Sequence, residues 1–218
     1  MLDTRSNVPT ERCAIFIDGS NFKFATYDSF GIRVDFKRFL DLLAGKSILL
    51  RAYYYIGEWD EAAIDCYLRL TRQTESSMRR RSMTSQRESD RKFWRFLNRN
   101  GFKVVRKPVR VFRDSEGIVT VKADLDLEIA IDVLTLAEKC DKMILVTGDG
   151  DFAPLVQAVA ARGVRVVVVS TQDEQAFQKA HYRASDELLD AADEFWDLRD
   201  FLDDIIRGPS VPEDNDGF

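Results

Sequence analysis

Short apolar runs alternate with amphipathic stretches along this chain. Runs that stop at polar turns predict β-strands at residues 13–17, 48–56, 102–105, 143–146 and 164–169. Apolar residues at helical spacing predict helices at 35–43, 61–100, 126–139, 152–162, 174–180 and 184–206. We expect residues 61–100 to form two helical pieces, with an apolar-poor, mobile middle at 74–89. A hairpin is expected over residues 109–121.

This alternation of strands and helices predicts an α/β fold, with a mostly parallel central sheet flanked by helices in three layers. The run of valines at 164–169 suits a strand that is covered on both faces. We expect one domain over residues 13–206, which contains a basic helical segment at 61–113. An N-terminal extension at residues 1–12 and a disordered acidic tail at 207–218 complete the expected organisation.

Composition narrows the class of protein. No apolar run approaches the roughly 18 residues of a membrane span, and residues 1–12 lack the order of a secretory signal. The three cysteines are far apart and contain no CxxC, as expected for reduced thiols. We therefore expect a cytoplasmic protein with no membrane partner. The single histidine, His181, argues against a histidine-rich zinc site, so that any metal would be held by oxygen.

The net charge of −5 hides a strong asymmetry along the chain. Residues 69–113 hold 15 Lys/Arg against three acids, a local net of 15 − 3 = +12, whereas residues 186–204 hold nine acids against Arg199. A basic stretch of this kind attracts a polyanion. Interleaved aromatic residues could stack on unpaired bases, although a helix face favours the core for Phe93 and Phe96. The candidate nucleic-acid contacts are Arg79, Arg80, Arg81, Arg91, Lys92, Arg95 and Lys122.

Acidic residues stand at the predicted strand ends. Asp18-Gly-Ser-Asn21 follows the first strand, Thr147-Gly-Asp-Gly-Asp151 follows the fourth, and Asp124, Asp126 and Glu128 stand at a helix start. Ligands of such sheets bind outside the carboxyl ends of the strands, where these groups can converge. Any one of these turns alone is as well explained by helix capping. Three together favour a site for Mg²⁺ or Mn²⁺, because neighbouring carboxylates repel unless they share a cation or a proton.

Three blocks resemble a known family. Ile15-Phe-Ile-Asp-Gly-Ser-Asn21, Asp126-Leu-Glu-Ile-Ala-Ile-Asp132 and Leu145-Val-Thr-Gly-Asp-Gly-Asp-Phe152 are similar, in order, to the signature blocks of NYN domains. The likeness is to the LabA-like branch, within the PIN-like nuclease superfamily. It runs from about Cys13 to about Leu198, and Ala192-Asp-Glu-Phe195 resembles the family's closing helix. It implies metal-dependent cleavage of RNA.

The resemblance also implies residue roles. By position, Asp18, Asp126, Asp149 and Asp151 match the family's acidic residues, expected to hold the metal, and Asn21 matches its polar residue in the catalytic group. The family often has Lys-Gly-Val-Asp where this chain has Lys122-Ala-Asp-Leu-Asp126, so Asp124 competes as a ligand. Asp132 lies one and a half turns beyond Asp126 and is expected to point elsewhere or act indirectly. The residues with a possible supporting role are Ser20, Asp124, Glu128, Asp132 and Thr147.

We therefore expect a ribonuclease, acting as an endonuclease on single-stranded RNA, in which a metal-activated water hydrolyses the phosphodiester bond. Two alternatives fit part of the pattern. A HAD-type phosphatase needs a second Asp two residues after the first, where this chain has Ser20. A non-catalytic RNA-binding or regulatory module would keep the fold without the reaction. A homodimer, formed through a sheet edge or the acidic segment 186–204, is a further expectation.

Overall fold

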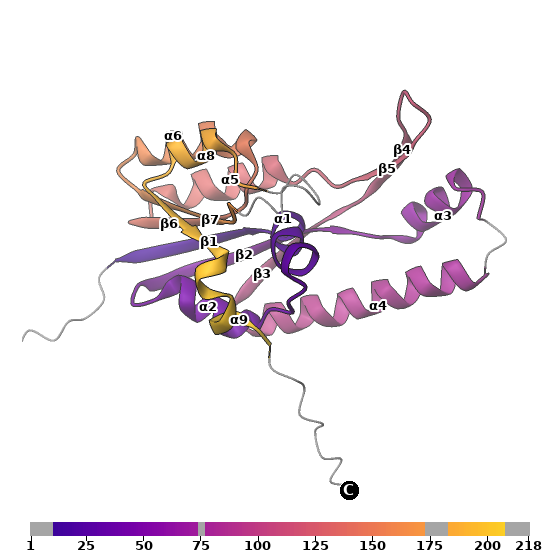
Figure 1. Ribbon diagram of the computed structural model, residues 1–218, viewed down its shortest axis with the longest axis horizontal. Helices are drawn as coiled ribbons and strands as arrows, with labels where there is room; N and C mark the ends of the chain where they lie inside the picture. Colours follow the sequence, from indigo (N-terminus) through magenta and orange to yellow (C-terminus); the bar gives the residue numbers. More distant parts are fainter. Residues whose placement is uncertain (1–10, 74–76, 173–182, 208–218) are drawn as a thin grey trace, which may run out of the picture.

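The centre of the protein is a six-stranded parallel sheet (Figure 1). The computed structural model describes residues 11–73, 77–172 and 183–207. Strand order across the sheet is β3-β2-β1-β6-β7-β8, and each neighbouring pair is parallel. The strands are β1 (Arg12–Asp18), β2 (Ile48–Glu58), β3 (Phe102–Pro108), β6 (Lys142–Val146), β7 (Arg165–Ser170) and β8 (Glu194–Asp197). All carboxyl ends therefore lie at one edge of the sheet.

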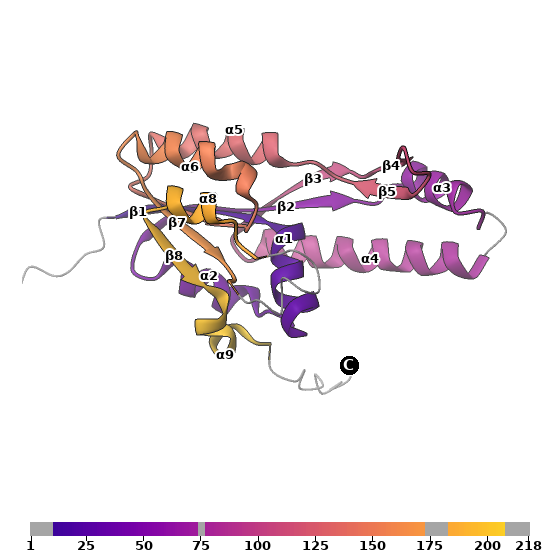
Figure 2. The same ribbon diagram turned by 45° about the horizontal axis from the view of Figure 1, so that its top comes forward.

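Helices cover both faces of the sheet, which makes three layers (Figure 2). One face carries α5 (Asp126–Ala137), α6 (Ala153–Ala160) and α8 (Asp186–Ala191). The other face carries α1 (Gly19–Lys23), α2 (Phe36–Ala44), part of α4 (Ser77–Arg99) and α9 (Leu202–Ile205). A π-helix (Phe24–Asp28) continues α1, and 3₁₀ turns at Gly150–Phe152 and Leu198–Phe201 precede α6 and α9. The expected three-layer α/β fold is confirmed.

The two cores follow the alternation of side chains along β1. Ala14 and Phe16 pack into the core under α5, α6 and α8. Ile15 and Ile17 pack into the opposite core, with residues of α1, α2, α4 and α9. All four side chains are fully buried. A strand that is buried on both faces reads as a continuous apolar run, as β1 does.

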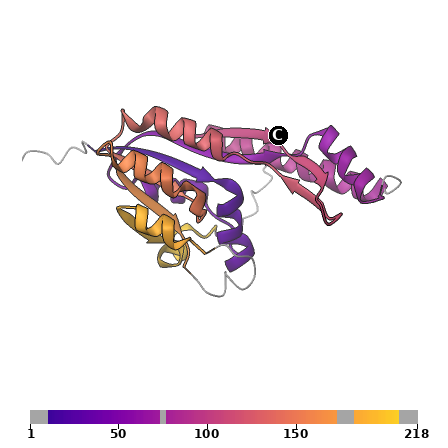
Figure 3. The same ribbon diagram turned by 90° about the horizontal axis from the view of Figure 1, so that it is seen from above.

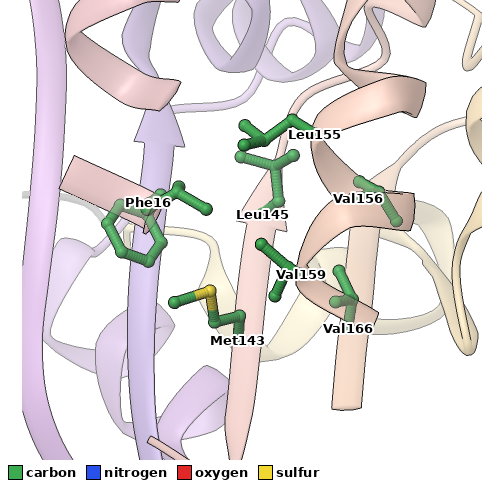
Figure 4. Close-up of a pocket in the computed structure, with 8 residues that line it drawn as sticks. Phe16, Met143, Leu145, Leu155, Val156, Val159 and Val166 are labelled. Atoms are coloured by element: carbon green, nitrogen blue, oxygen red, sulfur yellow. The ribbon is translucent and has the colours of Figure 1, made fainter. Parts of the chain in front are cut away.

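A small apolar gap lies inside the first of these cores (Figure 4). Its lining is entirely apolar and includes Phe16 and Leu145 of the sheet and Val156 and Val159 of α6. It lies under the helices and not at the carboxyl edge of the sheet. We therefore interpret it as a packing defect of the core and not as a substrate site.

An arm projects from the carboxyl edge of β2 and β3 (Figures 1 and 3). It consists of α3 (Glu61–Leu70), the amino-terminal part of α4 and an antiparallel hairpin of β4 (Arg110–Arg113) and β5 (Val119–Lys122). Salt bridges from Arg80 to Asp65 and from Arg87 to Glu61 hold α4 against α3. None of the helices in the described part of the chain is long and apolar enough to cross a membrane.

Most predicted elements are confirmed, and two expectations were wrong. Residues 77–89, expected to be mobile, belong to the continuous helix α4, because contacts with α3 replace the missing apolar face. Residues 184–206 do not form one helix. After α8, Ala192 is extended and the Asp193 carboxylate accepts the Val166 N–H at 2.7 Å, so the chain joins the sheet as strand β8. Ala192-Asp-Glu-Phe195 therefore leads into an edge strand and not into a closing helix.

The helix at 19–28 was not predicted, because the turn after β1 reads as a loop. The expected helix at 174–180, residues 1–10 of the extension expected at 1–12 and residues 208–218 of the tail expected at 207–218 lie outside the described residues, whereas Arg12 already belongs to β1. Residue 207, the first of the expected tail, is described: Arg207 donates its N–H to the Arg33 carbonyl at 2.7 Å.

Gly19 is the tightest backbone approach near the site. A Cβ built there would lie 2.5 Å from the Tyr55 carbonyl oxygen and 2.7 Å from the Tyr54 ring. Glycine to alanine inside a helix ordinarily stabilises by up to about 1 kcal/mol. We expect the opposite sign for Gly19→Ala, a decrease of about 1–3 kcal/mol from overpacking, measured by urea unfolding. Ser20→Ala, one residue further at an exposed position, is the control and should change stability by less than about 0.5 kcal/mol.

Candidate active site

The candidate site lies where the direction of strand addition reverses. From β1 the chain builds outward through β2 and β3, and from β6 it builds the other way through β7 and β8. Strands β1 and β6 are direct neighbours, with Ile17 paired to Val146. The residues after them, Asp18 and Thr147, therefore emerge side by side at the switch point, the usual ligand site of such sheets.

Asp18 is locked by the start of α1. It is the N-cap, and its Oδ1 accepts the backbone N–H groups of Ser20 and Asn21, both at 3.1 Å. The Thr147 side chain also hydrogen-bonds this carboxyl group. Burial raises the pKa of Asp18, and the nearby Asp149 carboxylate raises it further, while these hydrogen bonds oppose the shift. Asp18 is thus a rigid, poorly solvated carboxyl group that would gain from a nearby cation.

Asn21 connects the first and third sequence blocks. Its Oδ1 accepts the Gly148 N–H at 2.9 Å, across 127 positions of sequence. The contact holds the loop after β6 against the start of α1, and so fixes Asp149 relative to Asp18. In this structure Asn21 is a positioning residue. The Asn21 backbone N–H also donates to Asp18 Oδ1 at 3.1 Å, so this residue contacts both loops.

The two glycines of the Thr147–Asp151 loop allow close packing. A Cβ on Gly148 would lie 2.8 Å from Ser170 Oγ, and one on Gly150 would lie 2.6 Å from Ser185 Oγ. Ser185 also donates its N–H to the Gly148 carbonyl at 3.1 Å. Sequence reasoning missed both serines, because nothing local marks a residue whose role is to abut a distant glycine.

Asp149 and Asp151 take different positions. Asp149 caps the 3₁₀ turn, with its Oδ1 accepting the Asp151 N–H at 3.0 Å. Asp149 is close enough to raise the pKa of both Asp18 and Asp126. Asp151 is exposed, and none of the contacts described for its carboxylate ties it to Asp18 or Asp126. Asp149 therefore belongs to the acidic cluster more directly than Asp151 does.

Asp126 opens α5 as its first residue, with Leu125 as the N-cap. Its pKa is raised to about 6, chiefly by burial and then by the carboxylates of Asp124, Asp149 and Asp18. A hydrogen bond with the Asp124 carboxylate favours the protonated form as well. Asp18, Asp126 and Asp149 thus form one electrostatically coupled cluster, the "carboxylate cluster" below. Its members come from three different elements.

Asp124 and Glu128 form salt bridges with lysines at the edge of this cluster. Lys122 Nζ lies 3.1 Å from Asp124 Oδ2 and lowers the pKa of that carboxyl group. Lys107 Nζ lies 2.8 Å from Glu128 Oε1 and donates to the Asp124 carbonyl at 2.6 Å. Both acids are therefore neutralised by partners of their own. They are weaker candidates for a metal than Asp126.

Asp132 points to the sheet. Its Oδ2 accepts the Tyr55 hydroxyl of β2 at 2.9 Å, and this carboxylate adds to the burial that raises the pKa of Tyr55. The expectation that Asp132 lies apart from Asp126 agrees with this contact. Ser20 is exposed and binds Asp18 through its backbone N–H, so that its part in the site is that of the main chain.

The donor set of the cluster suits a hard divalent cation in its chemistry. Its ligand atoms would be carboxylate oxygens, and Mg²⁺ commonly contacts only one or two such groups and keeps several waters. Across the described residues, no three His, Cys, Asp or Glu side chains lie close enough to form a complete metal-binding group. Without a counter-charge the carboxylates repel each other, and a cation would favour their approach.

The carboxylate cluster and the arm fall within one known type of domain. The family model of the NYN domain matches residues 12–199, a span that contains both features. The chain belongs to the NYN domain family. The resemblance seen in three short sequence blocks is therefore confirmed over nearly the whole described structure.

Two comparisons place this NYN domain more closely. It is 29% identical over 206 residues to the Low amplitude and bright protein LabA of Synechococcus elongatus, covering 93% of this chain and 91% of LabA. A crystal structure of a protein of unknown function from Vibrio parahaemolyticus superposes with a TM-score of 0.64. That match has 24% identity and covers 93% of this chain and 99% of the other, and it supports the fold alone.

The basic segment of the NYN domain is less free than its sequence indicates. Arg80 binds Asp65, Arg91 lies 3.6 Å from Glu58, and Arg79 lies over the Tyr67 ring at 5.9 Å. These acids precede residue 69, and counting from 58 to 113 lowers the net charge to 15 − 7 = +8. Arg81 and Lys92 are exposed, and Arg95 donates its Nε–H to the Arg91 carbonyl at 3.4 Å. The arm remains basic, but some of its arginines are engaged in contacts within the protein.

Several aromatic residues in or next to the basic segment are buried. Tyr53, Tyr54, Tyr55 and Trp94 are buried, and Phe93 packs against the second core. Phe96, which helix periodicity assigned to the core, is instead 42% exposed. Phe112 of the hairpin is 43% exposed.

The raised pKa of Asp126 predicts that replacing this carboxyl group stabilises the fold by an amount that depends on pH. Its folded value of about 6 exceeds the ordinary 3.8, so the folded protein holds this proton more tightly and loses stability as pH rises from about 4 to 6. In metal-free protein, Asp126→Asn should raise Tm by about 2 °C or more at pH 7.5. At pH 4.5, where the native carboxyl is mostly neutral, the gain should be much smaller.

Thermal unfolding followed by circular dichroism measures this difference. Asp190→Asn, an exposed site on α8, is the matched control and should show no such pH-dependent gain. Equal Tm changes at both pH values for Asp126→Asn would show that the carboxylate cluster does not strain the fold.

Proposed function

We propose that this NYN domain is a ribonuclease that hydrolyses RNA phosphodiester bonds internally, with Mg²⁺ or Mn²⁺ at the carboxylate cluster. The observation that carries the proposal is the convergence of Asp18, Asp126 and Asp149 at the switch point, where burial and then mutual repulsion raise the pKa of Asp18 and of Asp126. Clustered, partly desolvated carboxyl groups are characteristic of functional sites.

Each residue has a distinct part in this proposal. Asp18, Asp126 and Asp149 would hold the cation, and Asp151 at the exposed rim would hold a second cation or orient the attacking water. A bound divalent ion supplies charge neutralisation for the phosphate and a water of lowered pKa. Asn21 and Thr147 keep the geometry, through Gly148 and Asp18 respectively.

The substrate class follows from the electrostatics. Carboxylates alone repel a phosphodiester, so binding needs cations beside the cluster. Lys122, whose pKa is raised by Asp124 and then by Asp126 and Asp149, stands at this border, and the arm extends the basic surface. The HAD-type phosphatase has no comparable support, because Ser20 occupies the position of its second Asp. A non-catalytic RNA-binding module remains the rival that experiment must separate.

Cleavage of a labelled circular single-stranded RNA tests the proposal. An endonuclease opens the circle, whereas an exonuclease cannot begin on it. We expect Mg²⁺- or Mn²⁺-dependent opening that EDTA abolishes, and a rate at least about 100-fold lower for Asp18→Asn and Asp149→Asn. Asp203→Asn, an exposed carboxylate of α9, is the control and should cleave at the wild-type rate.

Three results would contradict the proposal in different ways. RNA that is bound with metal present but never cut supports the non-catalytic module. Degradation of linear but not circular RNA would replace the endonuclease with an exonuclease. Cleavage that survives in Asp18→Asn and Asp149→Asn protein would place the reaction elsewhere.

The exposed face of α4 gives a separate prediction for RNA binding. Arg81 and Lys92 are 11 residues apart, about three helical turns, and so share one face. The double variant Arg81→Gln/Lys92→Gln should weaken binding and lower the slope of log K against log salt by about 0.7 for each phosphate that is no longer neutralised. Fluorescence anisotropy with a labelled oligonucleotide measures both quantities. Arg162→Gln, beyond the end of α6, is the control, and an unchanged salt slope in the double variant would exclude this face.

A further inference from the structure

The β4–β5 hairpin presents two cations on one face. In its register Arg110 is paired with Lys122, and Phe112 is paired with Thr120. Side chains two residues apart on a strand share a face. Arg110, Phe112, Thr120 and Lys122 therefore form one surface, called the "hairpin face" below. Three of its members are exposed: Arg110, Phe112 and Lys122.

The cation pair is unfavourable as it stands. Directly opposite residues of antiparallel strands have Cβ atoms about 4.5–5.5 Å apart, and like charges there destabilise the pair. Lys122 is offset by Asp124 at 3.1 Å. Within residues 11–73, 77–172 and 183–207, no hydrogen bond or ion pair engages the Arg110 guanidinium. An anion between Arg110 and Lys122 would relieve their repulsion.

Phe112 places an exposed aromatic ring beside the two cations, which a site for a simple anion would not need. It is 43% exposed, two residues from Arg110 on the same strand. The tyrosines of β2 are buried in the two cores, and Trp94 is buried with the Arg106 guanidinium 5.2 Å from its ring centroid. A flat apolar ring beside two cations matches the two parts of a nucleotide, since bases stack on aromatic rings and phosphates bind cations.

The hairpin face leads directly to the carboxylate cluster. Lys122 ends β5, and only Ala123, Asp124 and Leu125 separate it from Asp126. Gly57 at the end of β2 is packed so closely that an added Cβ would lie 2.7 Å from the Ala123 methyl, which fixes this connection against the sheet. A strand of RNA on the hairpin face would thus continue into the site where cleavage is proposed.

We propose that the hairpin face is the single-strand docking surface of this protein. Arg110 and Lys122 clamp one backbone phosphate beside the carboxylate cluster, and Phe112 stacks on an adjoining unpaired base. This inference rests on the proposed function, which places the scissile bond at the carboxylate cluster. It adds the surface that guides the RNA strand to that cluster. Arg110 and Phe112 are the new assignments.

This arrangement selects single strands over duplexes. In a duplex each base is already stacked and paired, so that Phe112 has no ring face to cover without unstacking the helix. A single strand offers its bases at no such cost. The clamp on phosphate carries no sequence information, so that the docking surface accepts many sequences.

Binding without cleavage tests the inference. The probe is a fluorescein-labelled oligo(U) of about 12 nucleotides, within the length that one compact single-strand site covers, in EDTA, with the full chain carrying Asp149→Asn. In that background Phe112→Leu should weaken binding about fivefold or more and leave the salt slope unchanged, whereas Phe112→Tyr should retain affinity. Arg110→Gln and Lys122→Gln should each weaken binding and lower the salt slope by about 0.7. Binding of double-stranded RNA should not respond to Phe112→Leu.

Two matched controls come from the same chain. Tyr27→Leu removes a ring that is 50% exposed from the π-helix after α1, and Lys139→Gln removes an exposed cation just beyond α5. Both should bind as the parent does, and none of the variants should unfold at a markedly lower Tm, because the changed side chains are exposed. Full affinity in Phe112→Leu, or an unchanged salt slope in Arg110→Gln, would overturn the inference.

The outcomes separate this inference from the proposed function. Wild-type protein that cleaves RNA while the hairpin variants bind normally contradicts the hairpin face and leaves the ribonuclease intact. Protein that binds oligo(U) through the hairpin face but cleaves no RNA with Mg²⁺ or Mn²⁺ supports the docking surface and contradicts the ribonuclease. Absence of any oligo(U) binding contradicts the docking surface.

Discussion

The parallel pairing of β1 with β6 is the constraint on which the site depends. The paired residues Ile17 and Val146 lie 146 − 17 = 129 positions apart in sequence, yet the carboxyl ends of their strands are adjacent. Parallel strands need long crossovers, and the crossovers here contain the arm and α5. The same pairing therefore brings Asp18 to Asp149 and returns Asp126 to the same edge. The hydrogen bond from Gly148 to Asn21 fixes this arrangement locally.

Electrostatic frustration is concentrated at this edge. Acidic side chains such as Asp141 and Asp197 have arginine partners, Arg12 and Arg199. In the carboxylate cluster, burial and the neighbouring carboxylates instead disfavour the charged form of each group. The pKa of Asp126 is raised to about 6 as a result. One uncharged side chain in place of an aspartate would remove this repulsion. Charged groups that destabilise a fold in this way are typical of sites that bind a ligand. Next to the carboxylate cluster, Arg110 and Lys122 lie opposite each other on the hairpin, so two positive charges repel there as the carboxylates do.

Much of the fold was accessible from periodicity, because apolar runs and helical spacing report directly on burial. The five strands predicted for the sheet, the hairpin and α2, α5 and α6 all lie close to their expected bounds. The failures have a common cause. The Asp193 carboxylate binds the backbone of β7 where β8 begins, and α4 forms salt bridges to α3. Contacts between distant residues replaced the local apolar signal in both places.

The sequence by itself determined the family, the three acidic blocks and the basic character of residues 69–113, because each is written in contiguous residues. Only the tertiary structure decided which members of those sets lie close together. It separated Asp132, bound to Tyr55, from Asp126, and it placed Asn21 on Gly148. It also showed that the tyrosines of β2 are buried, whereas Phe112 on the hairpin is exposed. Side-chain partners depend on strand order and register, and these are properties of the whole sheet that no single segment carries.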